Sequence, residues 1–145
     1  MYFVDREKIE AILLFMEKQI ELIQNHNSWK SEIEKSALER GVHTIIEAVL
    51  DTGNAMIDGF IMRDPGSYED IVDILTDEKV VDEELSLVLK DIISFRKMLV
   101  QQYSNVDHDA LLNVVSTSIN TLLTFPERVR TYLTHELGPV SAFKN

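Results

Sequence analysis

One arginine of this chain falls on the apolar face of a predicted helix. Drawn as a helix, residues 85–103 place six side chains on a single stripe: Leu85, Leu89, Ile92, Arg96, Leu99 and Tyr103. A guanidinium keeps its proton, so a partly buried one needs an anion, an aromatic ring or a water-filled cleft beside it. We therefore expect Arg96 to hold a carboxylate or a phosphate. Tyr103 is either a core tyrosine with a solvated hydroxyl or a residue at the mouth of a cleft where the helix ends.

Acidic partners for that arginine are available on the preceding long helix, predicted from residue 28 or 31 to residue 61. Opposite its apolar face runs a polar stripe of Arg40, Thr44, Glu47, Asp51, Asn54 and Asp58. Such a stripe is either a solvated face with local ion pairs or the lining of a polar cleft. In the second case Arg40, Glu47 and Asp51 belong to the cleft, and Glu47 or Asp51 supplies the anion for Arg96.

Other chemistries find less support in the sequence. His43, Glu47 and Asp51 recur every four residues on one side of a helix, a spacing that can ligate a metal ion. The Glu-x-x-His pairs that di-metal helical bundles place on other helices are absent, so we expect no metal and no cofactor. The sequence has no cysteine, no glycine-rich phosphate loop, and no serine nucleophile pattern beside any of its four histidines.

The elements that position these residues are all predicted to be helices, because apolar residues recur at three- and four-residue steps nearly throughout. We expect helices at about residues 5–25, 28–61, 68–76, 82–102, 107–123 and 127–137. The fold class is therefore all-α, an antiparallel bundle of about five helices in one domain spanning residues 1–145, with a loose tail over about 138–145. Three glycines inside the long helix, Gly41, Gly53 and Gly59, indicate either close approach of neighbouring helices or local bending.

Composition limits the compartment and the partners. The chain has 145 residues, a net charge of −11 and no cysteine, which excludes a disulfide framework. It shows no signal-peptide pattern, and no apolar run approaches the roughly 18 residues that span a bilayer. We therefore predict a cytoplasmic protein without membrane partners. The acidity argues against coating nucleic acid by bulk electrostatics but leaves room for one small positive cleft.

Several of these features together resemble a known family. The long acidic helix and the pattern Arg96-x4-Gln101-x-Tyr103 resemble the HepT-like branch of the HEPN (higher eukaryotes and prokaryotes nucleotide-binding) domains, whose motif is Arg, four to six residues, His, one residue, Tyr. The polar pattern of Arg40, Glu47 and Asp51 is similar to that of the branch. The two ends of the chain, residues 1–6 and 136–144, are similar to its YutE-type members.

The resemblance implies a metal-independent RNA endonuclease, the toxin of a pair whose antitoxin is a small nucleotidyltransferase. It also implies a homodimer in which two motifs face one cleft, with Arg96 holding the scissile phosphate and Tyr103 as the acceptor of AMP. Gln101 stands at the position of the family histidine, and an amide cannot carry a proton. We therefore expect an RNA- or nucleotide-binding cleft with impaired cleavage.

Two alternatives stay open at this point. The chain can be a non-enzymatic, acidic helical module that binds a nucleotidyltransferase or another protein. It can also be an active metal-independent ribonuclease that uses Arg96 with Tyr103 or with a distant histidine such as His108.

Overall fold

The computed structural model describes residues 2–138, and all regular secondary structure in this part of the chain is α-helical. Its seven helices are α1 (Arg6–Gln24), α2 (Glu32–Gly59), α3 (Tyr68–Asp77), α4 (Glu83–Ile93), α5 (Arg96–Gln101), α6 (His108–Leu122) and α7 (Thr124–Leu137). The predicted all-α bundle is confirmed. The tail that we expected to be loose falls almost wholly on residues 139–145, outside the described residues. That residues 1–145 form one domain stays a prediction.

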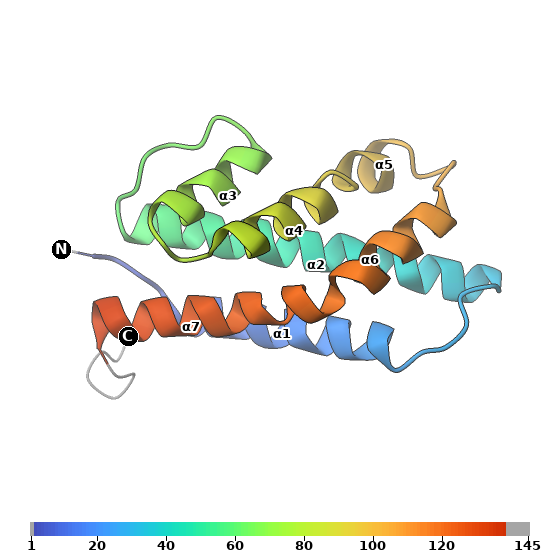
Figure 1. Cartoon of the computed structure of the whole chain (residues 1–145), viewed down its shortest axis with the longest axis horizontal. Helices are drawn as coiled ribbons and strands as arrows, with labels where there is room; N and C mark the ends of the chain where they lie inside the picture. The colour runs from blue at the N-terminus through green and yellow to red at the C-terminus, as the bar shows by residue number, and fades with distance from the viewer. Residues whose placement is uncertain (1, 139–145) are drawn as a thin grey trace.

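The long helix α2 is the centre of the bundle. It has 28 residues, which corresponds to about 42 Å at the usual rise of about 1.5 Å per residue. It packs against α1, α3, α4, α5 and α6, with α1 and α7 on one side and α3, α4 and α5 on the other (Figure 1). Its start is fixed by a capping box, in which Ser31 and Glu34 each accept a hydrogen bond from the other's backbone N–H.

Glycines let the neighbours of α2 approach closely, as the sequence indicated. A Cβ added to Gly53 would lie 2.4 Å from Cγ2 of Ile71 in α3, and one added to Gly41 would lie 3.1 Å from Cδ1 of Ile23 in α1. The first distance is far inside van der Waals contact. Gly53 therefore sets how close α3 lies to α2.

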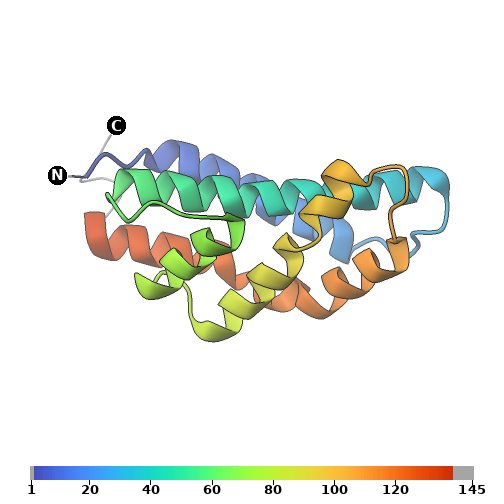
Figure 2. The same ribbon diagram turned by 90° about the horizontal axis from the view of Figure 1, so that it is seen from above.

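The segment predicted as one helix over residues 82–102 is divided into α4 and α5 at Ser94 and Phe95. The hydroxyl of Ser94 donates to the carbonyl of Asp91, and the N–H of Phe95 donates to the carbonyl of Ile92, three residues back instead of four. Such local bonds compete with the regular helical ladder. The chain turns there (Figure 2), and Arg96 becomes the first residue of the short helix α5.

The last helix begins at Thr124, three residues before the predicted start at residue 127. Pro126 is the third residue of α7 and is buried. A proline is tolerated in the first turn because its missing N–H would have no intrahelical acceptor there. The proline therefore lies within the first turn of α7 instead of preceding the helix.

Candidate functional site

Arg96 is held between α2 and α3. Its Nε donates to Oε1 of Glu47 over 2.8 Å, and its guanidinium carbon lies 4.5 Å from the ring centroid of Tyr68. Its side chain is 25% exposed. Of the two carboxylates proposed as its anion, the structure selects Glu47. A half-exposed ion pair contributes only about 0–1 kcal/mol, so its main effect is to fix the orientation of the guanidinium.

The outer edge of that guanidinium remains available. Within residues 2–138, neither Nη atom of Arg96 makes a hydrogen bond, and Arg96 forms an ion pair only with Glu47. Arg96 lines a groove of about 410 Å³ together with Ser67, Tyr68, Glu69, Ile93, Ser94, Lys97 and Gln101. Two cations therefore face one groove at the α3–α5 junction, and the Nη edge is the part of Arg96 that can bind a phosphate oxygen.

Glu47 has a second partner on its own helix. Nε2 of His43, one turn earlier, lies 3.1 Å from the same Oε1 that accepts from Arg96. The side chains of His43 and Glu47 are 30% and 32% exposed. One carboxylate oxygen thus joins an imidazole of α2 to the guanidinium of α5. The sequence indicated either a metal ligand or, with more support, a structural or solvated role for His43, and the four-residue spacing to Glu47 was the signal for this contact.

A second, smaller groove lies next to this cluster. Its volume is about 210 Å³, and Ser36, Glu39, Arg40, His43 and Leu99 line it. Nε2 of His108, the first residue of α6, lies 2.6 Å from Oε2 of Glu39. Arg96 lines the first groove, His43 lines the second, and Glu47 contacts both residues.

Tyr68 is positioned by the loop that enters α3. Arg63 donates two hydrogen bonds to the carboxylate of Asp70, over 2.8 and 2.9 Å, and the N–H of Gly66 donates to the same group. Arg63 foremost, and then that N–H, lower the pKa of Asp70 to about 2. These contacts fix the first turn of α3, and with it the ring beneath Arg96. No sequence pattern links Tyr68 to Arg96, because the two residues meet only in the tertiary structure.

Other predicted site residues lie apart from the Arg96–Glu47 pair. Helix α5 ends at Gln101, so Tyr103 does not continue the buried stripe, and it is 72% exposed. Asp51 is exposed on α2, and within residues 2–138 it makes no hydrogen bond or ion pair with Arg96. Arg40 is exposed and borders the smaller groove. Gln101, which was expected at the histidine position of the motif, lines the groove of Arg96.

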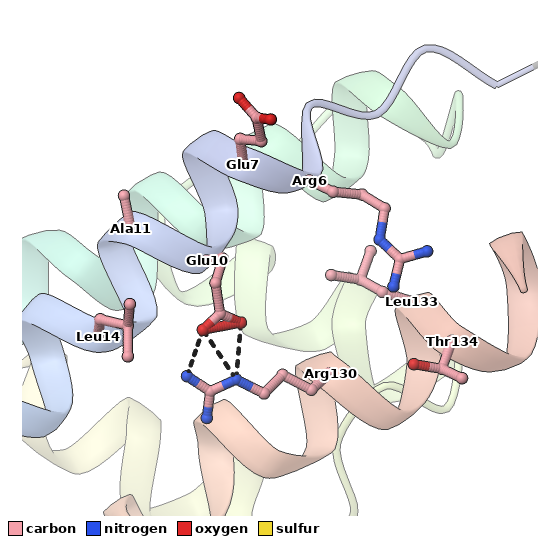
Figure 3. Close-up of a pocket in the computed structure, with 8 residues that line it drawn as sticks. All are labelled: Arg6, Glu7, Glu10, Ala11, Leu14, Arg130, Leu133 and Thr134. Atoms are coloured by element: carbon pink, nitrogen blue, oxygen red, sulfur yellow. Dashed lines mark hydrogen bonds and ion pairs between the residues drawn. The ribbon is translucent and has the colours of Figure 1, made fainter. Parts of the chain in front are cut away.

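A groove elsewhere in the molecule is less suited to anions. It has a volume of about 480 Å³ and is lined by α1 and α7: Arg6, Glu7, Glu10, Ala11, Leu14, Arg130, Leu133 and Thr134 (Figure 3). Arg130 is saturated by Glu10 and Glu17, and Arg6 donates to the carbonyl of Gly138. Because Arg130 is ion-paired with two carboxylates and Arg6 is 9% exposed, the Arg96 groove is the better candidate for an anionic ligand.

Two further properties concern the described residues. Among residues 2–138, no group of three or more His, Asp or Glu side chains is arranged to hold a metal ion. In the same part of the chain, no helix combines the length and the apolar character that a membrane crossing requires.

Comparison with known proteins decides the family. The family model "Ribonuclease HepT-like" matches residues 5–129. This chain is a member of the HepT-like family. It is 56% identical over 144 residues to a protein of Bacillus subtilis (strain 168) named "Putative RNase YutE", a match that covers 99% of this chain and 100% of that protein. The resemblance stated from the sequence is therefore confirmed at the level of the family.

Solved structures agree. The structure of YutE from Bacillus subtilis, described as a cytosolic protein of unknown function, superposes with a TM-score of 0.95 over 99% of this chain and 100% of that one. A tri-AMPylated HEPN toxin of Shewanella oneidensis, in complex with its MNT antitoxin, superposes with a TM-score of 0.72. It shares 18% identity, and the match covers 86% of this chain and 95% of that toxin. This second likeness shows the HEPN fold.

Proposed function

We propose that this HepT-like protein binds single-stranded RNA through Arg96 and cleaves it slowly without a metal ion. The observation that carries the proposal is the state of Arg96. Glu47 and Tyr68 fix its guanidinium, its Nη atoms make no hydrogen bond, and Arg96 lines a groove that also holds Lys97. An arginine immobilised in this way matches the oxygen pair of a phosphate without losing much side-chain entropy on binding.

Tyr68 suits a nucleic acid as well. Its ring is about half exposed at the edge of the Arg96 groove, and exposed aromatic faces stack with unpaired bases. RNA supplies the 2′-hydroxyl that a metal-independent cleavage needs as its nucleophile. Single-stranded RNA is therefore the ligand that best fits the cation and the ring together.

The reduced rate follows from Gln101. It lines the groove at the position where the family motif has histidine, and an amide cannot take up a proton near neutral pH. General acid–base help contributes about 10²–10⁴-fold to such reactions. We expect this protein to cleave more slowly than family members that keep the histidine, by a factor within that range.

The test is RNA binding by Arg96→Ala beside a matched control, Arg128→Ala. Arg128, on α7, pairs with Asp82, the N-cap of α4, and lines neither groove. Replacing it removes the same charge as replacing Arg96. A hydrogen bond to a charged group contributes about 1.5–3 kcal/mol, so Arg96→Ala should weaken affinity for a labelled single-stranded RNA by about tenfold or more. Its salt slope should fall by about one. Equal affinities for the two variants would refute the proposal and favour the acidic interaction module.

Partners are proposed from the family. The Shewanella oneidensis toxin was solved as an AMPylated protein with its antitoxin, and we extend this to a nucleotidyltransferase partner, a homodimer of this chain, and Tyr103 as AMP acceptor. The 72% exposure of Tyr103 supports the last point, since a modifying enzyme must reach the phenol. Mass spectrometry after incubation with ATP and a family nucleotidyltransferase should find AMP on the wild type and none on Tyr103→Phe.

A further inference from the structure

The slow cleavage proposed above still requires a group that removes the proton of the attacking 2′-hydroxyl. Gln101 cannot do so, and the phenol of Tyr103 belongs to a residue beyond the end of α5 with a largely exposed side chain. We infer that His43, on α2, is the proton acceptor of this protein. The inference rests on the proposed function and assigns a catalytic residue outside the Arg-Gln-Tyr motif.

The position of His43 comes from the shared carboxylate. Oε1 of Glu47 lies 2.8 Å from Nε of Arg96 and 3.1 Å from Nε2 of His43, so the guanidinium and the imidazole are held beside each other on one oxygen. Arg96 lines one groove and His43 the other, with Glu47 between them, and in this proposal an RNA strand crosses both grooves, with its phosphate at Arg96 and its 2′-hydroxyl at His43. This is the relation that an in-line attack needs, with one group on the phosphate and one on the 2′-hydroxyl.

The same contact sets the tautomer of the imidazole. Because a carboxylate oxygen accepts from Nε2–H, the neutral ring carries its proton on Nε2, and Nδ1 is left as the acceptor. Glu47 also stabilises the imidazolium that forms when Nδ1 takes up a proton, as a carboxylate does in other histidine-dependent sites. Glu47 is thus a positioning residue for both Arg96 and His43.

The remaining charged groups around His43 do not take over this role. Glu39 and Arg40 line its groove from α2, Arg96 approaches from α5, and His108 of α6 is bonded to Glu39. Within residues 2–138, Glu39 makes no hydrogen bond or ion pair with Arg96, so His108 is not coupled to the phosphate-binding cation. His26 and His135 border neither groove.

The reaction is a transesterification whose atoms balance without a further reactant. The 2′-oxygen bonds to phosphorus while its proton passes to Nδ1 of His43, and the bond from phosphorus to the 5′-oxygen breaks. The leaving 5′-oxygen takes a proton from solvent, and the imidazolium returns one to solvent. The products are a 2′,3′-cyclic phosphate and a 5′-hydroxyl. Arg96 stabilises the charge that develops on the phosphate oxygens.

The experiment measures single-turnover cleavage of a labelled RNA and, separately, RNA affinity. His43→Gln keeps an N–H donor for Glu47 but no proton acceptor, and it should lower the cleavage rate by about 10²–10⁴-fold with affinity changed less than about twofold. The matched control, His135→Gln on the exposed end of α7, should cleave like the wild type.

Two readouts separate catalysis from a structural role. The wild-type rate should fall on acidification, because a protonated imidazole cannot accept a proton, whereas the rate of His43→Gln should not show this fall. Added imidazole should restore part of the rate of His43→Ala. A cleavage product whose 3′ end is neither the 2′,3′-cyclic phosphate nor the monophosphate formed by its hydrolysis would contradict the proposed step.

The outcomes distinguish this inference from the proposed function. If His43→Gln cleaved RNA at the wild-type rate while binding still depended on Arg96, the role of His43 would be overturned and the RNA site would stand. RNA binding without detectable cleavage by the wild type would also overturn it. If Arg96→Ala bound and cleaved RNA like the wild type, the proposed function itself would be refuted.

Discussion

Replacing Gly53 by alanine should destabilise the bundle and displace the ring beneath Arg96. The added Cβ would lie 2.4 Å from Cγ2 of Ile71, whereas carbon atoms in contact lie about 3.5–4.0 Å apart. One of the two helices must therefore move by more than about 1 Å, or Ile71 must leave its rotamer. Ile71 is 3% exposed, so its side chain has no open space to enter.

The size of the effect follows from two opposing contributions. Alanine is favoured over glycine within a helix by about 1 kcal/mol, while overpacking a well-filled core costs about 1–3 kcal/mol. We expect Gly53→Ala to lower the free energy of unfolding by up to about 2 kcal/mol. In an Ile71→Ala background the clashing methyl is gone, and the same substitution should raise the free energy of unfolding by up to about 1 kcal/mol.

Urea denaturation of the wild type, both single variants and the double variant measures this double-mutant cycle. The sign of the Gly53→Ala effect should reverse between the two backgrounds. Since α3 carries Tyr68, the single variant should also bind RNA more weakly than its stability loss explains. A stabilised Gly53→Ala, or an equal effect in both backgrounds, would show that α2 and α3 do not meet at this glycine.

Three other perturbations test separate parts of the structure. Arg130→Met, which leaves Glu10 and Glu17 facing each other without their cation, should lower the free energy of unfolding by about 1–2 kcal/mol, and by less at high salt. The pKa of Asp70 is lowered from 3.8 to about 2, mainly by Arg63. This carboxylate therefore stabilises the fold above pH 3.8, and its contribution to the free energy of unfolding is lost as the pH falls toward 2. Asp70→Asn should be less stable than the wild type at pH 7, and acid titration followed by circular dichroism should show a smaller loss in that window. Gln101→His places an imidazole in the Arg96 groove and should raise the rate of RNA cleavage, in His43→Gln as well as in the wild type; an unchanged rate in both would indicate that the groove does not receive the 2′-hydroxyl.

Helical periodicity was sufficient to predict the pairing of Arg96 with an acid of the long helix. The apolar stripe predicted which face of residues 85–99 points inward, and Glu47 and Asp51 were the two proposed anions on the polar stripe of the long helix. The choice between those two depends on where α5 crosses α2, and periodicity does not contain that information. The turn at Ser94 was not predictable either, because serine and phenylalanine both occur inside helices.

Contacts between side chains of different helices could not be predicted from the sequence. Tyr68 begins a helix separated from Arg96 by the whole of α4, and its position depends on the Arg63–Asp70 bonds and on the close packing at Gly53. His43 was visible as a neighbour of Glu47, but its link to Arg96 exists only because α5 reaches the same carboxylate oxygen.

That shared oxygen also explains how an acidic chain can bind an anion. With a net charge of −11, the long-range field repels RNA, but salt at physiological strength screens charges beyond about 8 Å. The electrostatic interactions that remain are those between close neighbours in the groove. Glu47 neutralises the inner edge of Arg96 and holds it in place, while the Nη edge and Lys97 face the groove. Affinity then depends on one or two phosphate contacts, so it should be modest and should vary little with salt. Under the proposed function, recognition by a few fixed groups, instead of by a broad basic surface, would let the protein act on RNA without being retained by it.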